Sequence, residues 1–82
     1  MPESLVLYHT DGCHLCELAF ELLLPLGLSV ARVDICDDET LAVRYGTRIP
    51  VLRQADGREL NWPFDQQAVK KFLGDNFEFG SN

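Results

Sequence analysis

Two cysteines separated by two residues, Cys13 and Cys16, have the type and spacing that most directly suggest chemistry. A thiolate in the first turn of a helix is stabilised by unpaired backbone N–H groups and by the positive end of the helix dipole. A second thiol three residues later lies on the same face of the helix. This arrangement is suited to reversible disulfide formation, so the spacing indicates thiol–disulfide exchange.

A helix position would make Cys13 the more reactive of the two thiols. A free cysteine has a pKa of about 8.5 and is only a few per cent thiolate at neutral pH. A helix N-terminus contributes about 0.3–2 kcal/mol, which corresponds to roughly 0.2–1.5 pKa units. This brings the expected pKa of Cys13 towards ~7. Cys13 is therefore the candidate nucleophile, and Cys16 is the candidate resolving thiol.

The elements that would position these cysteines are a buried strand and an amphipathic helix. Residues 5–8 form a continuous apolar run, which is typical of a strand buried on both faces of a sheet. A turn at Asp11-Gly12 follows, and a helical pattern then runs until Pro25 and Gly27. The apolar stripe expected to pack on the sheet is Leu15, Leu18, Ala19, Leu22, Leu23 and Leu26.

The middle of the chain predicts a second strand and a short helix. The strand spans residues 28–35, and the helix spans residues 39–45. Asp37 or Asp38 is expected to cap this helix, and Gly46 to end it. The face of the strand expected to turn inward is Ala31, Val33 and Ile35.

The last part of the chain predicts a hairpin, a helix and a tail. Residues 50–54 and 58–61 are expected to pair as antiparallel strands across a turn signal. Asn61 or Asp65 is the expected cap of a final helix. Residues 74–82 are expected to form a loosely held tail. The buried stripe of the final helix is expected to be Ala68, Val69, Phe72 and Leu73.

Length and charge restrict the class of protein. With 82 residues the chain, residues 1–82, is expected to be one domain. Its formal net charge is −6, without a basic cluster, which argues against nucleic acid or an anionic membrane as a partner. The N-terminus does not resemble a secretory signal, and three cysteines are too few for a disulfide framework. We expect a cytoplasmic monomer.

The element order β-α-β-α-β-β-α, with C-x-x-C after the first strand, resembles the thioredoxin fold in its small glutaredoxin-like form. This is an α/β fold with a mixed four-stranded sheet flanked by helices. Residues 34–38 and 45–52 also look like glutaredoxin-like proteins. Residues 56–60 and 62–65 are similar to a mainly bacterial glutaredoxin-like family of unassigned function. The resemblance implies a cis Ile49–Pro50 bond, in a loop that faces the sulfur of Cys13 and positions substrate.

Several positions differ from the usual glutaredoxin pattern. His14 and Leu15 replace Pro and Tyr between the cysteines, and Thr10 replaces a Lys that often precedes them. Arg48-Ile49-Pro50 replaces Thr-Val-Pro. Residues 61–65 replace the Gly-Gly-x-Asp-Asp segment that holds glutathione carboxylates and keep at most one Asp. We therefore expect no bound cofactor, and glutathione remains open as a substrate with little support from these residues.

Each candidate site residue has a functional and a structural interpretation. Gly12 belongs to the turn before the cysteines, and His14 either favours the thiolate or is simply an exposed residue at the helix start. Arg48 either pairs with the thiolate or a substrate carboxylate, or is solvated. Trp62 and Asp65 are candidate groove residues.

Two further residues are assigned structural roles. His9 is interpreted as a strand-end residue rather than a proton relay. Cys36 is interpreted as a strand-end cysteine, and the resemblance places it away from the reactive turn.

The leading functional hypothesis is a dithiol–disulfide oxidoreductase acting on a disulfide-containing protein or a low-molecular-weight thiol. The first alternative is a non-catalytic binding module that offers the apolar segment Trp62-Pro63-Phe64 to a protein partner. The second is a metal or iron–sulfur site. Zinc normally needs four ligands, and only His9 and Cys36 could assist the cysteine pair, so the sequence predicts no metal.

Overall fold

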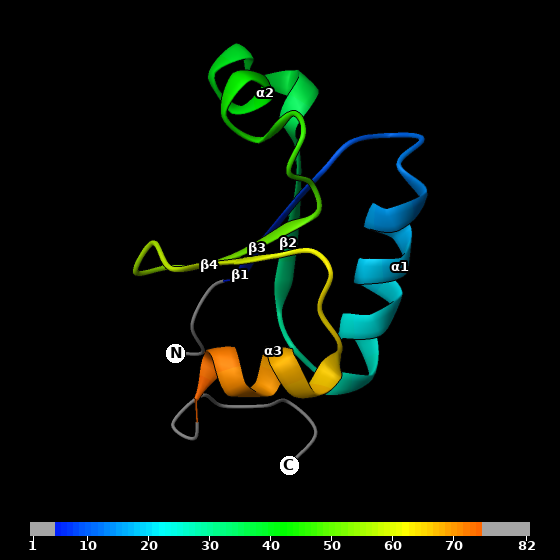
Figure 1. The fold of residues 1–82 in the computed structure, drawn as a ribbon, viewed down its shortest axis with the longest axis vertical. Coiled ribbons are helices and arrows are strands. Elements are labelled where there is room, and N and C mark those ends of the chain that lie inside the picture. The colour runs from blue at the N-terminus through cyan, green and yellow to red at the C-terminus, as the bar shows by residue number, and fades with distance from the viewer. Residues whose placement is uncertain (1–4, 75–82) are drawn as a thin grey trace.

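The computed structural model describes residues 5–74, and seven helices and strands follow one another along this part of the chain (Figure 1). Their order, β-α-β-α-β-β-α, confirms the prediction. Apart from Gly74, the predicted C-terminal tail lies outside the described residues. The elements are β1 (Leu5–His9), α1 (His14–Leu23), a 3-10 turn η1 (Leu24–Leu26), β2 (Val30–Asp34), a 3-10 turn η2 (Ile35–Asp37), α2 (Glu39–Tyr45), β3 (Val51–Gln54), β4 (Glu59–Asn61) and α3 (Gln66–Leu73).

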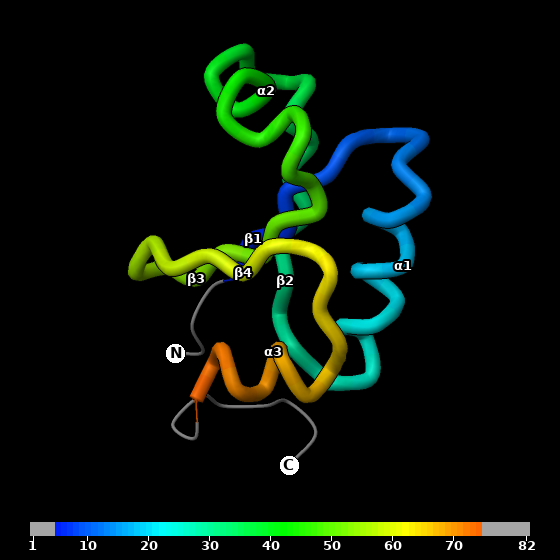
Figure 2. The backbone as a smooth tube through the Cα atoms, viewed as in Figure 1, coloured from blue at the N-terminus to red at the C-terminus, as the bar shows by residue number. Residues whose placement is uncertain are grey.

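The four strands form one mixed sheet in the order β2-β1-β3-β4 (Figure 2). β1 pairs in parallel with β2 and antiparallel with β3, while β3 pairs antiparallel with β4. In the centre of the sheet Leu7 lies between Arg32 of β2 and Leu52 of β3 and is completely buried. This central position explains the continuous apolar run of β1. The predicted mixed four-stranded sheet is confirmed.

The helices cover the sheet on two sides. α1 and α3 pack on one face, and α2 packs on the other; Figure 1 shows α2 well separated from α1 and α3. The larger core is formed by Leu5, Leu7, Ala19, Leu23, Leu26, Leu52, Phe64, Val69 and Leu73. The smaller core is formed by Tyr8, Ile35, Tyr45 and Val51.

The buried face of α1 differs from the predicted stripe. Cys16, Ala19 and Leu23 are buried, whereas Leu15 and Leu18 are 45% and 40% exposed. The apolar residues of this helix occupy two adjacent faces, and the sheet covers only one of them. Cys16 belongs to the covered face because it behaves as a small apolar residue. The prediction that Leu15 and Leu18 pack on the sheet was therefore wrong.

β2 is shorter and more exposed than predicted. Among the described residues it lies at the edge of the sheet and has β1 as its one neighbour. Ala31 is exposed, Val33 is half-buried, and Ile35 is buried but belongs to η2 rather than to the strand. The predicted inward face is correct for Val33 and Ile35 and wrong for Ala31.

Aspartate caps fix the start of α2 and α3. The Asp38 carboxylate accepts a hydrogen bond from the Thr40 N–H at 2.8 Å, and the Asp65 carboxylate accepts one from the Ala68 N–H at 2.7 Å. Of the alternatives that the sequence left open, the caps are thus Asp38 and Asp65. The buried stripe of α3 is confirmed, since Val69 and Leu73 are buried and the other two positions are half-buried.

We expect Asp65→Ala to lower the free energy of unfolding by about 1 kcal/mol, because the first turn of α3 loses its cap. Asp65→Asn should keep most of the stability, since asparagine caps helices as well as aspartate does. Urea denaturation followed by Trp62 fluorescence measures both changes. Equal losses for the two variants would mean that the charge, and not the cap, matters at this position.

Candidate functional site

The turn between β1 and α1 sets the position of the first cysteine. The Cys13 N–H donates to the carbonyl of Thr10 at 3.3 Å, which closes the turn. Gly12 has φ +81°, in the region that residues with a Cβ rarely adopt. An added Cβ would meet no atom within 4 Å, so the backbone conformation alone favours glycine here.

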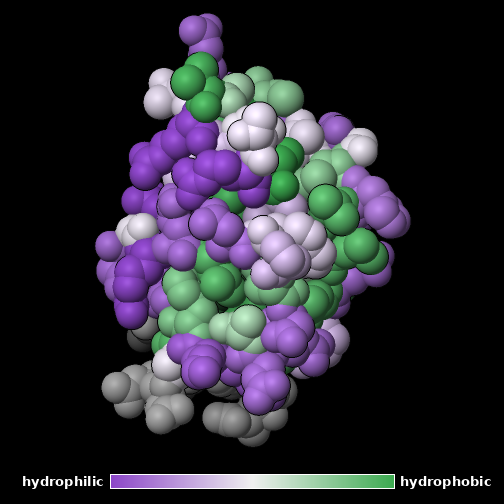
Figure 3. Space-filling view, viewed as in Figure 1, coloured by the Kyte–Doolittle hydropathy of each residue, from purple (hydrophilic) through white to green (hydrophobic). Residues whose placement is uncertain are grey.

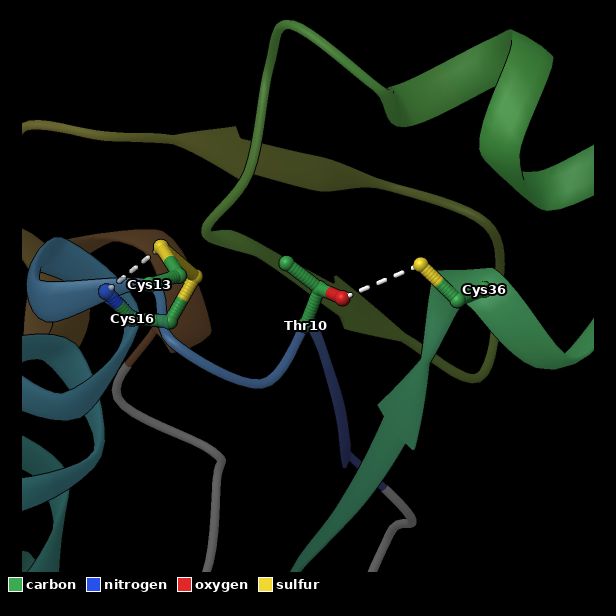
Figure 4. Close-up of a disulfide and its surroundings, with 4 residues drawn as sticks. All are labelled: Thr10, Cys13, Cys16 and Cys36. Carbon is green, nitrogen blue, oxygen red and sulfur yellow. Dashed lines mark hydrogen bonds between the residues drawn. A yellow bond between two sulfur atoms is a disulfide. The ribbon is translucent and has the colours of Figure 1, made fainter.

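Cys13 is the N-cap residue of α1, which confirms its predicted place at the start of the helix. Its Sγ accepts a hydrogen bond from the Cys16 N–H at 3.1 Å. The two cysteines form a disulfide with their Cα atoms 5.2 Å apart (Figure 4). Cys13 is partly exposed, whereas Cys16 is only 2% exposed. One sulfur is thus accessible to a reaction partner, and the other is sheltered behind it.

The two histidines lie in different environments. His14 is the first residue of α1, is exposed, and directly follows Cys13 in the sequence. His9 is the last residue of β1 and is 8% exposed.

The segment before β3 contains a cis Ile49–Pro50 peptide bond. Pro50 is buried, and its carbonyl accepts a hydrogen bond from the Trp62 N–H at 3.3 Å. The Ile49 N–H donates to the Tyr45 carbonyl at 3.2 Å, so this donor is used within the protein.

A groove of about 400 Å³ joins this segment to the cysteine motif. Leu15, which lies between the two cysteines, forms one wall, and Ile49 and Trp62 come from elements far along the chain. The lining residues are Leu15, Thr47, Arg48, Ile49, Asn61 and Trp62. Trp62 is therefore a groove residue, as predicted, but Asp65 caps α3 and lines a separate surface hollow with Lys70 and Lys71.

Arg48 is held by the protein rather than free in the groove. Its guanidinium donates to the Glu59 carboxylate at 3.0 Å and to the Asn61 side-chain carbonyl at 3.0 Å. Its side chain is 38% exposed, while that of Glu59 is 15% exposed. The predicted alternative of a solvated Arg48 is therefore wrong, while its pairing with a thiolate or a substrate carboxylate stays a prediction. β4 supplies both of its partners, which local sequence does not reveal.

Glu59 also accepts a hydrogen bond from the Tyr45 hydroxyl. This bond, followed by the Arg48 contact, holds the pKa of the Glu59 carboxyl below its ordinary value of 4.5. Burial, followed by the Glu59 contact, raises the pKa of Tyr45 above 10.0. Tyr45 stacks on Tyr8 with ring centroids 4.4 Å apart. Sequence reasoning missed Glu59, whose only local signal is an acid within a predicted strand.

Cys36 lies closer to the reactive turn than predicted. Its thiol and the Thr10 hydroxyl share a hydrogen bond of 3.1 Å, and Thr10 begins the turn that leads to Cys13 (Figure 4). The Asp34 carboxylate accepts the Cys36 N–H at 2.9 Å, which lowers the pKa of Asp34. The correction follows from the parallel pairing of β1 and β2, because it brings the ends of both strands to the same edge of the sheet.

The segment Trp62-Pro63-Phe64 offers less apolar surface than predicted. Phe64 is 7% exposed and belongs to the larger core, where it meets Trp62 edge to face with centroids 5.0 Å apart. The Trp62–Pro63 bond is also cis. Trp62 is thus the aromatic residue of this segment that reaches the groove.

Residues 4–74 match the family described as the glutaredoxin-like domain (DUF836). The chain belongs to this family. The match confirms the resemblance drawn from the sequence, and the sheet and helices confirm the thioredoxin-like fold.

Two solved structures are similar to this chain in sequence and in fold. The X-ray structure of the structural genomics target XcR50 from X. campestris shares 46% identity, with a TM-score of 0.79 over 84% of this chain and 93% of that chain. Protein Ne2328 from Nitrosomonas europaea, solved by NMR, shares 29% identity, with a TM-score of 0.72 over 90% of this chain and 94% of that chain. No curated protein matches this chain.

Among residues 5–74, no three His, Cys, Asp or Glu side chains come together in a way that could hold a metal ion. Over the same residues, none of the helices is both long and apolar enough to cross a membrane.

We expect Glu59→Gln to destabilise this domain by about 1–2 kcal/mol at pH 7, because a charged acceptor shared by Tyr45 and Arg48 is lost. Partial exposure of Arg48 keeps the loss modest, since water screens its contact with Glu59. The lowered pKa of Glu59 means that its charge stabilises the fold above about pH 4.5. The difference from wild type should shrink as pH falls through that lowered pKa.

Urea denaturation at pH 7 and pH 3 measures this difference. Asp56→Asn is the control, because Asp56 and Arg58 pair through side chains that are 48% and 65% exposed. Its effect should be much smaller than that of Glu59→Gln, because water screens an exposed pair. A Glu59→Gln effect that is independent of pH would contradict a role for the charge.

Proposed function

We propose that this protein is a thiol–disulfide oxidoreductase in which Cys13 is the nucleophile and Cys16 the resolving thiol. The observation that carries the proposal is the cysteine pair at the N-terminus of α1, within disulfide-forming distance and with only Cys13 accessible. The helix N-terminus favours the thiolate form of Cys13. Membership of the glutaredoxin-like domain family supports the assignment.

In the reaction that we assign, the Cys13 thiolate attacks one sulfur of a substrate disulfide. A Cys13–substrate disulfide forms, the substrate S–S bond breaks, and the other substrate sulfur leaves as a thiolate that takes up a proton. Cys16 then loses its proton and attacks the Sγ of Cys13, which releases the second substrate thiol and forms the Cys13–Cys16 disulfide. Two electrons pass to the substrate, and a dithiol donor restores the reduced protein while becoming a disulfide itself.

The surrounding residues position Cys13 and the substrate and take no part in making or breaking bonds. Gly12 provides the backbone turn that presents Cys13, and exposed His14 flanks the thiolate. Ile49, which precedes the buried Pro50, lines the groove in which we expect the substrate to be held. Arg48 acts through its contacts with Glu59 and Asn61, which anchor that side of the groove to β4.

The proposed activity needs no bound cofactor, because sulfur chemistry of the two cysteines accounts for both steps. Glutathione remains a candidate substrate or donor rather than a resident group. A reducing compartment such as the cytoplasm would keep the pair in its active dithiol form. We propose that the protein acts as a monomer.

Replacing each cysteine by serine tests the order of attack. Cys13→Ser should reduce insulin or a mixed disulfide no faster than the reaction without protein, because the accessible sulfur is lost. Cys16→Ser should accumulate mixed disulfides on Cys13, which mass spectrometry of trapped adducts detects. Cys36→Ser is the matched control and should retain the wild-type rate.

Two results would overturn the proposal. Equal rates for wild type and Cys13→Ser would show that the pair does not carry the activity. A Cys13–Cys16 couple that forms reversibly yet exchanges with no disulfide would favour the alternative of a non-catalytic binding module.

The helix position of Cys13 also predicts its alkylation profile. The rate of iodoacetamide modification of the reduced protein should rise with pH around a midpoint well below the ~8.5 of a free thiol. The sign follows from the helix N-terminus, which stabilises the thiolate. Mass spectrometry at limiting reagent, with Cys36→Ser as the background, follows Cys13 directly. A midpoint at or above ~8.5 would contradict this account.

A further inference from the structure

The groove that Leu15 of the cysteine motif lines has both apolar and polar walls. Three of its six lining residues, Leu15, Ile49 and Trp62, are apolar, and the others are a threonine, an asparagine and one arginine. Its volume of about 400 Å³ is in the range of sites that hold a small molecule or a few side chains. The apolar part of the lining can pack against an apolar side chain of an occupant.

The apolar surface continues from the groove along α1. Leu15 and Leu18, three residues apart on one side of the helix, are 45% and 40% exposed. Figure 3 shows hydrophobic side chains gathered over α1, on the right of the face in view. A polypeptide can extend from the groove over this surface, whereas a small thiol compound can fill the groove alone.

The charges of the groove lining, and those of the α1 helix that supplies Leu15 to it, disfavour an acidic occupant. Among the described residues that line the groove, Arg48 is the one cation, and its guanidinium is 3.0 Å from the Glu59 carboxylate. Arg44, 4.0 Å from the same carboxylate, lies on α2 and lines another hollow with Glu39. The charged residues of α1 are Glu17 and Glu21, both acidic and exposed.

From this combination we infer that the groove accepts a polypeptide disulfide whose reacting cysteine has an apolar neighbour and basic flanking residues, in preference to glutathione disulfide. Each glutathione half carries two carboxylates, for which the groove offers no unpaired cation among its described residues. The acids of α1 instead complement a basic segment. The inference rests on the proposed function, and its sulfur chemistry is the exchange described for Cys13 and Cys16.

Single-turnover kinetics with the pre-reduced protein test this specificity. Trp62, the one tryptophan of the chain, lines the groove and reports its occupation by fluorescence. The substrates are symmetric disulfides of the blocked peptides Lys-Cys-Leu-Lys, Lys-Cys-Gly-Lys and Glu-Cys-Leu-Glu, glutathione disulfide, and uncharged 2-hydroxyethyl disulfide as the reference. Each rate is divided by the rate with 2-hydroxyethyl disulfide. On this scale the Lys-Cys-Leu-Lys disulfide should react about tenfold faster than glutathione disulfide, which is the factor expected for partly burying one leucine side chain.

Matched variants separate the groove from the rest of the surface. Leu15→Gln should lower the preference for the leucine peptide over the glycine peptide about tenfold, whereas Leu24→Gln, another exposed leucine, should leave it unchanged. Glu17→Gln should reduce the preference for the lysine peptide over the glutamate peptide, and Glu39→Gln on α2 should not. Added salt should weaken the charge preference and spare the leucine preference.

The outcomes distinguish this inference from the function on which it rests. Equal relative rates for glutathione disulfide and the Lys-Cys-Leu-Lys disulfide would overturn the inference while the oxidoreductase activity stands. If no disulfide reacts, the proposed function fails, and the inference about the groove is then tested by peptide binding. In that case Trp62 fluorescence of a Cys13→Ser/Cys16→Ser variant is titrated with S-methylated peptides. Saturable binding of the Lys-Cys-Leu-Lys peptide, without binding of the other two peptides, supports the groove assignment. If the Lys-Cys-Leu-Lys peptide does not bind, or if all three peptides bind equally, the assignment is overturned.

Discussion

The carboxylate of Glu59 connects three parts of the fold, of which β4 and the segment before β3 line the candidate site. It lies on β4, accepts the Tyr45 hydroxyl at the end of α2, and pairs with Arg48 in the segment before β3. Because Tyr45 is buried against Tyr8 of the central strand, the same contact fixes this segment relative to β1. β1 leads directly to Cys13. The mostly buried carboxylate of Glu59 thus helps to fix the wall of the groove relative to the strand that leads to Cys13.

The architecture was accessible from sequence because its signals are local. An unbroken apolar run can be stable only where a strand is covered on both sides, and this identified β1 as central. Asp38 and Asp65 act through hydrogen bonds to N–H groups two or three residues away, so the starts of α2 and α3 follow from short windows. The position of Cys13 at the helix start has the same origin.

The features that sequence reasoning missed depend on contacts between distant residues. Arg48 looks like a free cation until β4 brings Glu59 and Asn61 beside it. Leu15 and Leu18 fit an apolar stripe, yet the sheet covers only the adjacent face of α1. Cys36 reaches Thr10 because two parallel strands end together. In each case the local pattern allows several environments, and tertiary pairing selects one.

The central place of β1 has a consequence for how the site comes into being. The cysteine motif follows β1 closely, but the opposite wall comes from residues near β3 and β4, which begin more than 40 residues after β1 ends. β3 pairs antiparallel with β1, and β4 pairs antiparallel with β3. During synthesis the thiols therefore emerge before the groove that would select their partner. The chain must close a loop between these distant segments to assemble the site. The residues that react therefore precede, along the chain, the residues that would select the substrate.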